Sequence, residues 1–282
     1  ITTLKSLNLH HNNIEDEGVE FISDLKLESL GLCRCALTSK STSFLCKITS
    51  LKKLDLSENI INDECGFYLS MLTDLEELDL HDNSIEGKCF KEFSSLKKLK
   101  TLKLCQNRIS QEEAMIYLSQ TVSLKSLNLS QNNIGQSSIH LSNLTNLKEL
   151  ELNLCKITKG GLSFFSNLKK LEILKISQNS LGYDDFEELS HLVRLRILSI
   201  FGCGLEKNST NFIGNIKTLR NLEMFSNNIY DAGLASLSGL VNLQILKLDS
   251  TRITDTGIQH LSQMKELEIL RLNSNSLGNE TL

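Results

Sequence analysis

The sequence lacks proline and tryptophan altogether, and it has few aromatic residues. Aromatic side chains account for 5% of the 282 residues, whereas hydrophobic residues reach 40%. That apolar content is enough for a folded core and too high for a disordered chain. Aliphatic side chains, chiefly leucine and isoleucine, must therefore fill the core.

A basic excess and a long apolar run are also missing. The chain carries 30 Lys and Arg residues against 34 Asp and Glu residues, which gives a formal net charge of -4. Nucleic-acid binding needs positive charge to neutralise phosphates, so we expect no nucleic-acid partner. No apolar run approaches the roughly 18 residues of a membrane span, so we expect no membrane insertion.

The cysteines lack the spacing of a disulfide framework or of a zinc or redox motif. We expect all eight to be free thiols, which favours an intracellular location. Four Asn-X-Ser/Thr sequences support the alternative, an extracellular location. They begin at Asn128, Asn143, Asn208 and Asn279.

A phrase of the form LxxLxLxxNxI recurs along the whole chain, beginning with LKSLNLHHNNI at Leu4. Successive copies are 23, 24 or 25 residues apart, and there are twelve. The ninth position falls at Asn12, Cys35, Asn59, Asn83, Asn107, Asn132, Cys155, Asn179, Cys203, Asn227, Thr251 and Asn275.

Each part of the phrase has a mechanical reason. Leu7 and Leu9 alternate with polar residues, which predicts a strand with one buried face. Crossovers of about a dozen residues between strands require parallel pairing. At the ninth position an Asn side chain can pair with buried backbone groups of adjacent turns, so we expect an asparagine ladder in which Cys or Thr can substitute.

The segments that follow the phrase predict short helices, because apolar residues such as Ile258, Leu261 and Met264 lie three apart. Helices need more room than strands, so we expect the sheet on the concave side of a horseshoe. We predict strands centred near these residues, with their side chains in solvent: Asn8, Gly31, Asp55, Asp79, Lys103, Asn128, Glu151, Lys175, Ser199, Glu223, Lys247 and Arg271.

This pattern resembles the leucine-rich-repeat family over essentially the whole chain. Its lack of proline, and its glycines Gly18, Gly161, Gly233 and Gly257 before the helical stripe, are similar to repeats of bacterial and plant proteins. The resemblance implies an α/β leucine-rich-repeat solenoid of about twelve repeats, forming a single domain over residues 1–282. Neither end has the polar cap that a solenoid needs, so we expect the chain to be part of a longer protein.

One group of residues is a candidate for a catalytic or metal-binding site. The register places His81 beside Cys105, with Asp79 and Asp82 nearby. An open sheet supplies neither an oxyanion hole nor a pocket that excludes water, so we expect no enzyme activity, and we expect neither a metal nor another cofactor.

Apolar residues appear where the sheet should face water in repeats eight to twelve, and exposed apolar areas with polar rims mark partner sites. We predict a partner-binding site centred on Phe201 and Phe225. It comprises Ile173, Lys175, Ile197, Phe201, Phe225, Ile245, Lys247, Ile269 and Arg271.

A second candidate is an acidic patch in repeats three and four, which is either a solvated charged face or a site for a basic partner. It comprises Asp55, Glu58, Glu77, Asp79 and Asp82.

These observations favour an intracellular protein-interaction module that binds a partner protein on its concave face, such as a scaffold or a bacterial effector acting in a host cell. Two alternatives remain open. The chain is an extracellular receptor or adhesin ectodomain, or it selects substrates for a ubiquitin ligase whose catalytic domain lies outside it.

Overall fold

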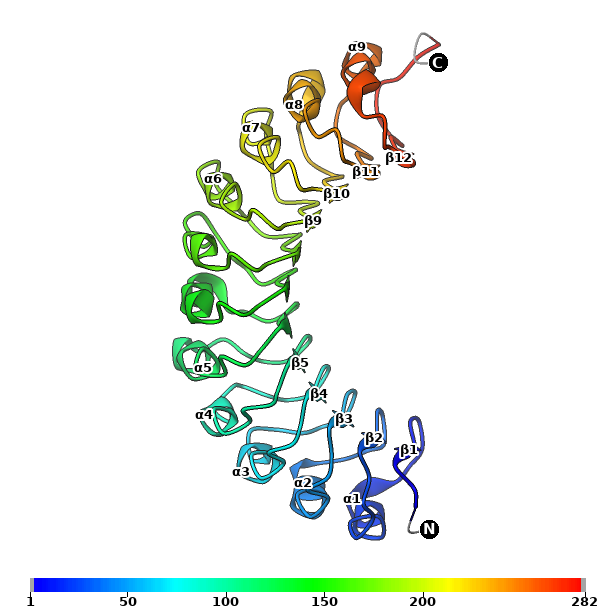
Figure 1. Cartoon of the computed structure of the whole chain (residues 1–282), viewed down its shortest axis with the longest axis vertical. Helices are drawn as coiled ribbons and strands as arrows, with labels where there is room; N and C mark the ends of the chain where they lie inside the picture. The colour runs from blue at the N-terminus through cyan, green and yellow to red at the C-terminus, as the bar shows by residue number, and fades with distance from the viewer. Residues whose placement is uncertain (1–2, 280–282) are drawn as a thin grey trace. The chain divides into compact units, whose positions relative to one another are not determined.

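The computed structural model describes residues 3–279. It forms two compact units, Ile1–Leu147 and Lys148–Leu282, called unit 1 and unit 2. In each unit the strands lie on the inner side of the unit's own curve and the helices on the outer side (Figure 1). We call these sides the sheet face and the helix face. The predicted repeat solenoid with parallel strands and short helices is confirmed.

Each repeat contributes one strand of three residues. The strands of unit 1 are β1 (Ser6–Asn8), β2 (Ser29–Gly31), β3 (Lys53–Asp55), β4 (Glu77–Asp79), β5 (Thr101–Lys103) and β6 (Ser126–Asn128). Those of unit 2 are β7 (Glu149–Glu151), β8 (Ile173–Lys175), β9 (Ile197–Ser199), β10 (Asn221–Glu223), β11 (Ile245–Lys247) and β12 (Ile269–Arg271). Within each unit consecutive strands pair in parallel, with equivalent residues opposite one another.

The predicted strand centres are one residue too late. Asn8 and its equivalents end their strands, and the Leu before each of them is the centre. This Leu is buried in β2 to β11, half-buried in β1 and exposed in β12. At Asn8 and its equivalents most side chains are exposed or half-buried, as predicted, but Gly31 and Ser199 are buried. The reason is local, because the ring of His10 covers Gly31 and the hydroxyl of Ser199 lies between two polar neighbours.

The helices are short, and most are a single turn. Unit 1 has α1 (Glu15–Glu20), η1 (Ser39–Ser41), α2 (Thr42–Leu45), α3 (Cys65–Leu69), α4 (Phe90–Phe93), α5 (Glu112–Leu118) and η2 (Gly135–Asn143), where η marks a 3₁₀ helix. Unit 2 has η3 (Phe165–Asn167), α6 (Asp185–Leu189), α7 (Thr210–Ile213), α8 (Tyr230–Leu237), α9 (Asp255–Ile258) and η4 (Gln259–Gln263). No helix in the described residues is long and apolar enough to cross a membrane.

The core is a column of leucines closed by a few aromatic rings. Leu54, Leu78 and Leu102 on adjacent strands are at most 2% exposed, and Phe90 and Phe93 of α4 are fully buried. Each such side chain contributes about 1.5–3 kcal/mol when it leaves water. The helices therefore cover the outer side of the sheet, where these leucines point.

The asparagine ladder forms as predicted. The Nδ2 of Asn83 donates to the carbonyls of Leu56, Leu80 and His81, and its Oδ1 accepts from the amide of Ile61. One side chain thus joins two successive repeats through backbone groups that would otherwise be buried without partners.

Where Cys or Thr replaces the ladder Asn, the backbone changes conformation. The following residues Ala36, Lys156, Gly204 and Arg252 have positive φ, between 55° and 70°. In this conformation the backbone amide of the Cys or Thr can donate to the ladder Asn of the following repeat. The Oδ1 of Asn59, for example, accepts from the amides of both Cys35 and Leu37. The thiol of Cys35 in turn donates to the carbonyl of Leu9.

All eight cysteines are free thiols. Cys65 and Cys89 occupy equivalent places on adjacent repeats and are both buried. Burial and the nearby Cys65 thiol raise the pKa of Cys89 well above the ordinary value of 9.0. The Cys89 thiol is therefore protonated at neutral pH.

Candidate functional site

The centre of the predicted partner site is a stacked pair of rings on the sheet face of unit 2. Phe201 and Phe225 follow adjacent strands, and their ring centroids are 4.2 Å apart with an interplanar angle of 9°. Both side chains are half-buried. The amide of Phe201 donates to the Oγ of Ser177, which fixes the backbone beneath the first ring. The rings offer a flat apolar surface on a rigid support.

The isoleucines form a separate column at the start of the strands. Ile173 opposes Ile197, and Ile245 opposes Ile269. Asn221 interrupts this column, and its Oδ1 is buried without a hydrogen-bond partner. Phe201 comes four positions after Ile197, which is about 13 Å along an extended chain. The predicted site is therefore two apolar areas with a polar column between them.

The predicted lysines of the rim are paired within the protein. The Nζ of Lys175 lies 2.6 Å from Glu151, and that of Lys247 lies 2.5 Å from Glu223. Glu223 also accepts from the Oγ of Ser199, which approaches that of Ser177 at 3.0 Å. These side chains form an ordered polar floor between the two apolar areas. Arg271, at the end of β12, is exposed and has no ion pair among the described residues.

The predicted acidic patch lies on the sheet face of unit 1 and is also internally paired. Glu77 binds Lys53 at 2.7 Å, and the Oδ2 of Asp79 binds Lys103 at 2.9 Å. Although burial raises it, hydrogen bonds from Lys103 and His81 hold the pKa of Asp79 below its ordinary value. The Oδ1 of Asp55 accepts from the amide and hydroxyl of Ser57.

Glu58 and Asp82 complete this patch. Glu58 lies 3.9 Å from the Nε2 of His81 and accepts from the thiol of Cys33. Asp82 is exposed. The patch is thus a network of ion pairs and hydrogen bonds with one carboxylate open to solvent.

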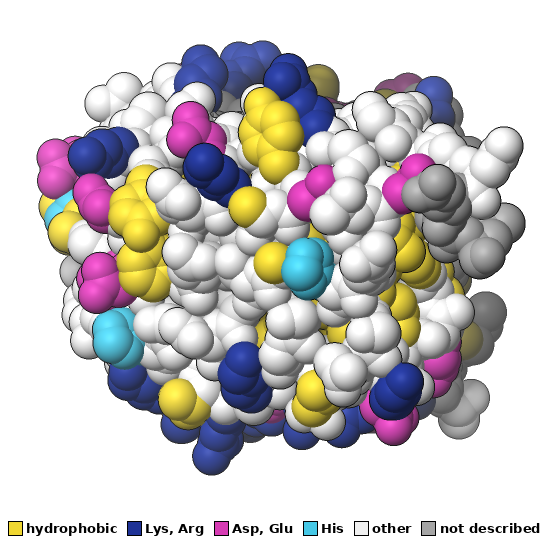
Figure 2. Space-filling model, turned by 90° about the horizontal axis from the view of Figure 1, so that it is seen from above, with side chains coloured by type: hydrophobic (Ala, Val, Ile, Leu, Met, Phe, Trp, Pro, Cys, Tyr) yellow, Lys and Arg dark blue, Asp and Glu magenta, His cyan; other side chains and the backbone are white. Residues whose placement is uncertain are grey.

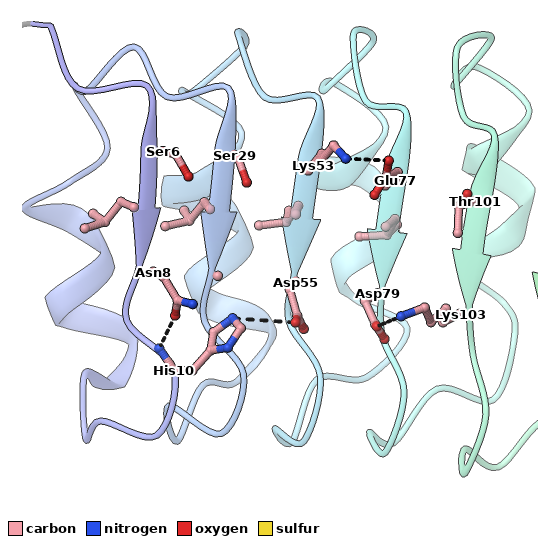
Figure 3. Close-up of a pocket in the computed structure, with 15 residues that line it drawn as sticks. Ser6, Asn8, His10, Ser29, Lys53, Asp55, Glu77, Asp79, Thr101 and Lys103 are labelled. Carbon is pink, nitrogen blue, oxygen red and sulfur yellow. Dashed lines mark hydrogen bonds and ion pairs between the residues drawn. The ribbon is translucent and has the colours of Figure 1, made fainter.

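A hollow of about 290 Å³ opens beside these residues (Figure 3). It exists because Ser6, Ser29 and Gly31 place small side chains on adjacent strands. A Cβ on Gly31 would overlap the imidazole of His10, whose Nε2 lies 3.6 Å from Asp55. Sequence reasoning missed this hollow, although the small residues Ser6, Ser29 and Gly31 in the first two strands were its visible signal.

His81, the histidine of the candidate chemical group, is held in place by Asp79. The Nδ1 of His81 lies 2.9 Å from Asp79, and the same carboxylate accepts from the amide of His81. In the described part of the chain no three His, Cys, Asp or Glu side chains converge to hold a metal ion. These two contacts fix the orientation of the His81 ring against Asp79.

Charges of both signs alternate with apolar side chains on the surface. Figure 2 shows Lys and Arg beside Asp, Glu and hydrophobic side chains on the face in view. The two areas described above differ from this mixed surface in their ring pair and in their network of ion pairs.

Comparisons with known proteins agree with this architecture. Two leucine-rich-repeat profiles match, one over residues 49–109 and 145–205 and the other over residues 1–23, 122–138 and 215–238. No curated protein sequence matches the chain significantly.

Solved structures with the same fold come from bacteria and plants. An internalin (inlF) of Listeria monocytogenes aligns over 99% of this chain and 83% of its own, with 23% identity and a TM-score of 0.76. The Arabidopsis receptor kinase HAESA, in complex with the peptide hormone IDA and the co-receptor SERK1, aligns over 97% of this chain with 21% identity and a TM-score of 0.68. The plant peptide hormone receptor RGFR1, in complex with RGF2, aligns over 98% with 19% identity and a TM-score of 0.60.

The chain spans 46% of the HAESA chain and 50% of the RGFR1 chain. At these identities the likeness concerns the fold. Together the matching profiles cover more than half of the chain, in register with its strands and ladder residues. The chain belongs to the leucine-rich-repeat family.

Proposed function

We propose that this chain is a protein-interaction module that binds a partner protein on the sheet face of unit 2, over Phe201 and Phe225. The observation that carries the proposal is the stacked ring pair, which stands half-exposed on a sheet whose core is already complete without it. The plant receptors HAESA and RGFR1 were solved in complex with the peptide hormone IDA and with RGF2, which supports protein binding by this fold.

The rings supply affinity because they are rigid and already stacked. Covering an apolar side chain of this size is worth about 1.5–3 kcal/mol, so the pair is worth roughly 3–6 kcal/mol to a partner that covers both. The ordered floor of Ser177, Ser199 and Glu223 costs little further entropy on binding. Such preorganisation favours recognition of a defined partner.

The test replaces both rings with serine and uses the chain as bait in extract of its native cells. We expect Phe201→Ser/Phe225→Ser to lose more than nine-tenths of the captured partner, as measured by quantitative mass spectrometry. The matched control is Phe67→Ser, because Phe67 is 60% exposed on the helix face. We expect that control to bind as the parent does.

The thermal midpoint separates this role from a structural one. A midpoint within about 2 °C of the parent is expected for half-exposed rings, whereas a large drop would assign them to the core. Unchanged capture at an unchanged midpoint would contradict the proposal and point to the acidic patch.

The compartment is part of the same proposal. The eight free thiols support a reducing, intracellular environment, as for a scaffold or a host-directed bacterial effector. Glycan analysis of the native protein tests the extracellular alternative, because an N-glycan at Asn143 or Asn208, which are both exposed, would contradict the intracellular proposal.

A further inference from the structure

One column of charged residues lies at the edge of the sheet face, where each strand begins, and we call it the edge column. In unit 2 it consists of Lys148, Glu172, Arg196, Arg220, Gln244 and Glu268. Each member lies one repeat from the next, because the backbone amide of Arg196 donates to Glu172 and that of Arg220 donates to Arg196.

At most other positions the members of this column form ion pairs with their neighbours. In unit 1 Glu28 binds Lys5 at 3.2 Å and Lys52 at 2.7 Å, and Glu76 binds Lys100 at 2.5 Å. In unit 2 Lys148 binds Glu172 at 3.3 Å. Neighbours of opposite charge therefore neutralise one another from Lys5 to Lys100 and between Lys148 and Glu172, whereas Lys125, which follows Lys100, has no ion pair among the described residues.

Arg196 and Arg220 break this alternation. Both side chains are exposed, and within the described residues neither guanidinium has a carboxylate within 4.0 Å. The neighbour on one side, Glu172, is already bound to Lys148, and the neighbour on the other side, Gln244, is neutral. Two like charges on adjacent strands repel each other, so nothing in the fold itself accounts for them.

We propose that Arg196 and Arg220 together bind the side-chain carboxylates of an acidic segment of the partner. Guanidinium groups bind carboxylates through two parallel hydrogen bonds, and groups on adjacent strands, about 4.8 Å apart, are spaced to share one acidic cluster. The proposal rests on the proposed function, because the same segment covers the isoleucine column and the ring pair.

The register sets the spacing of the segment that fits. Ile197 comes directly after Arg196, and Phe201 lies five residues on, about 16 Å along the strand direction. An extended segment with Asp or Glu at one end and an aromatic or large aliphatic residue about five residues away reaches both the arginines and the rings. Lys175 and Lys247 do not compete, because Glu151 and Glu223 hold them.

A random twelve-residue peptide library displayed on phage provides the probe. We expect peptides selected on the parent chain to be enriched in Asp or Glu about five residues from an aromatic or large aliphatic residue. A synthetic peptide from this selection should bind at least tenfold more weakly to Arg196→Gln/Arg220→Gln, and its affinity for that variant should depend less on salt.

Charge reversal and a matched control sharpen the result. Selection on Arg196→Glu/Arg220→Glu should replace the acidic residues with Lys or Arg and keep the apolar ones. Arg108→Gln, which removes an exposed arginine of unit 1, should bind the selected peptide as the parent does. Circular dichroism and the thermal midpoint confirm that each variant is folded.

The outcomes separate this inference from the proposed function. Peptides that require Phe201 and Phe225 but bind the Arg196→Gln/Arg220→Gln variant at full strength would overturn the arginine site alone. Peptides whose binding depends on neither the two phenylalanines nor the two arginines would overturn both the arginine site and the proposed function. A selection that enriches no peptide over an empty surface would do the same. Selection of peptides rich in Lys or Arg on the parent chain would also refute the inference, because the proposed site requires acidic residues.

Discussion

The ladder predicts unequal costs for two asparagines that look alike in the sequence. In both Asn59 and Asn107 the Nδ2 donates to three carbonyls. The Oδ1 of Asn59 accepts from two amides, those of Cys35 and Leu37, at 2.9 and 3.0 Å. That of Asn107 accepts from one amide, that of Ile85, at 2.9 Å.

Replacement of either asparagine with alanine leaves these amides without an acceptor. A buried unsatisfied donor costs about 1–3 kcal/mol. Asn107→Ala should therefore lower the free energy of unfolding by about 1–3 kcal/mol for its amide, and Asn59→Ala by about twice that amount. The carbonyls add a smaller and equal contribution, because both side chains donate to three of them. The expected difference between the variants is about 1–3 kcal/mol.

Urea unfolding, followed by far-ultraviolet circular dichroism, measures both variants beside the parent. The two residues lie in unit 1 and are both half-buried, so their environments match. Equal destabilisation, or a larger loss for Asn107→Ala, would refute the idea that a Cys-containing repeat donates a second backbone hydrogen bond to the asparagine of the following repeat.

Three further outcomes are expected. Gly202 has φ near 61°, so Gly202→Ala should lower the free energy of unfolding by about 1 kcal/mol, and a urea midpoint that rises would contradict this. The pKa of Asp79 is lowered in the folded chain from an ordinary 3.8, so its contribution to stability is present above that pH and is lost as the pH falls through the lower folded value. The stability lost in Asp79→Asn should therefore shrink between pH 7 and pH 3 in urea titrations, and a constant difference would count against it. Burial raises the pKa of Cys203 to about 11, so alkylation by iodoacetamide at pH 8 should be about a hundredfold slower than in the unfolded chain, as measured by peptide mass spectrometry; equal rates would place the thiol in solvent.

The sequence alone determined the repeat, the parallel strands and the ladder. The reason is that these features depend on local periodicity: apolar residues two apart make a strand, and a polar residue at every twenty-fourth position must pair with backbone groups of the next repeat. The same register placed Phe201 beside Phe225 and Ile173 beside Ile197 before any coordinates were known. The strand centres were one residue off, because periodicity marks which side chains are buried more sharply than where hydrogen bonding begins and ends.

Only the tertiary structure decided which charges are free. The sequence presents Lys175, Lys247 and the carboxylates of the acidic patch as open groups, but ion pairs form between residues about 24 positions apart and depend on where flexible side chains meet. For the same reason the unpaired Arg196 and Arg220 stand out only once their neighbours' partners are known. The hollow over Gly31 likewise depends on a ring from the preceding repeat folding over it, which is a matter of packing in three dimensions that no single repeat contains.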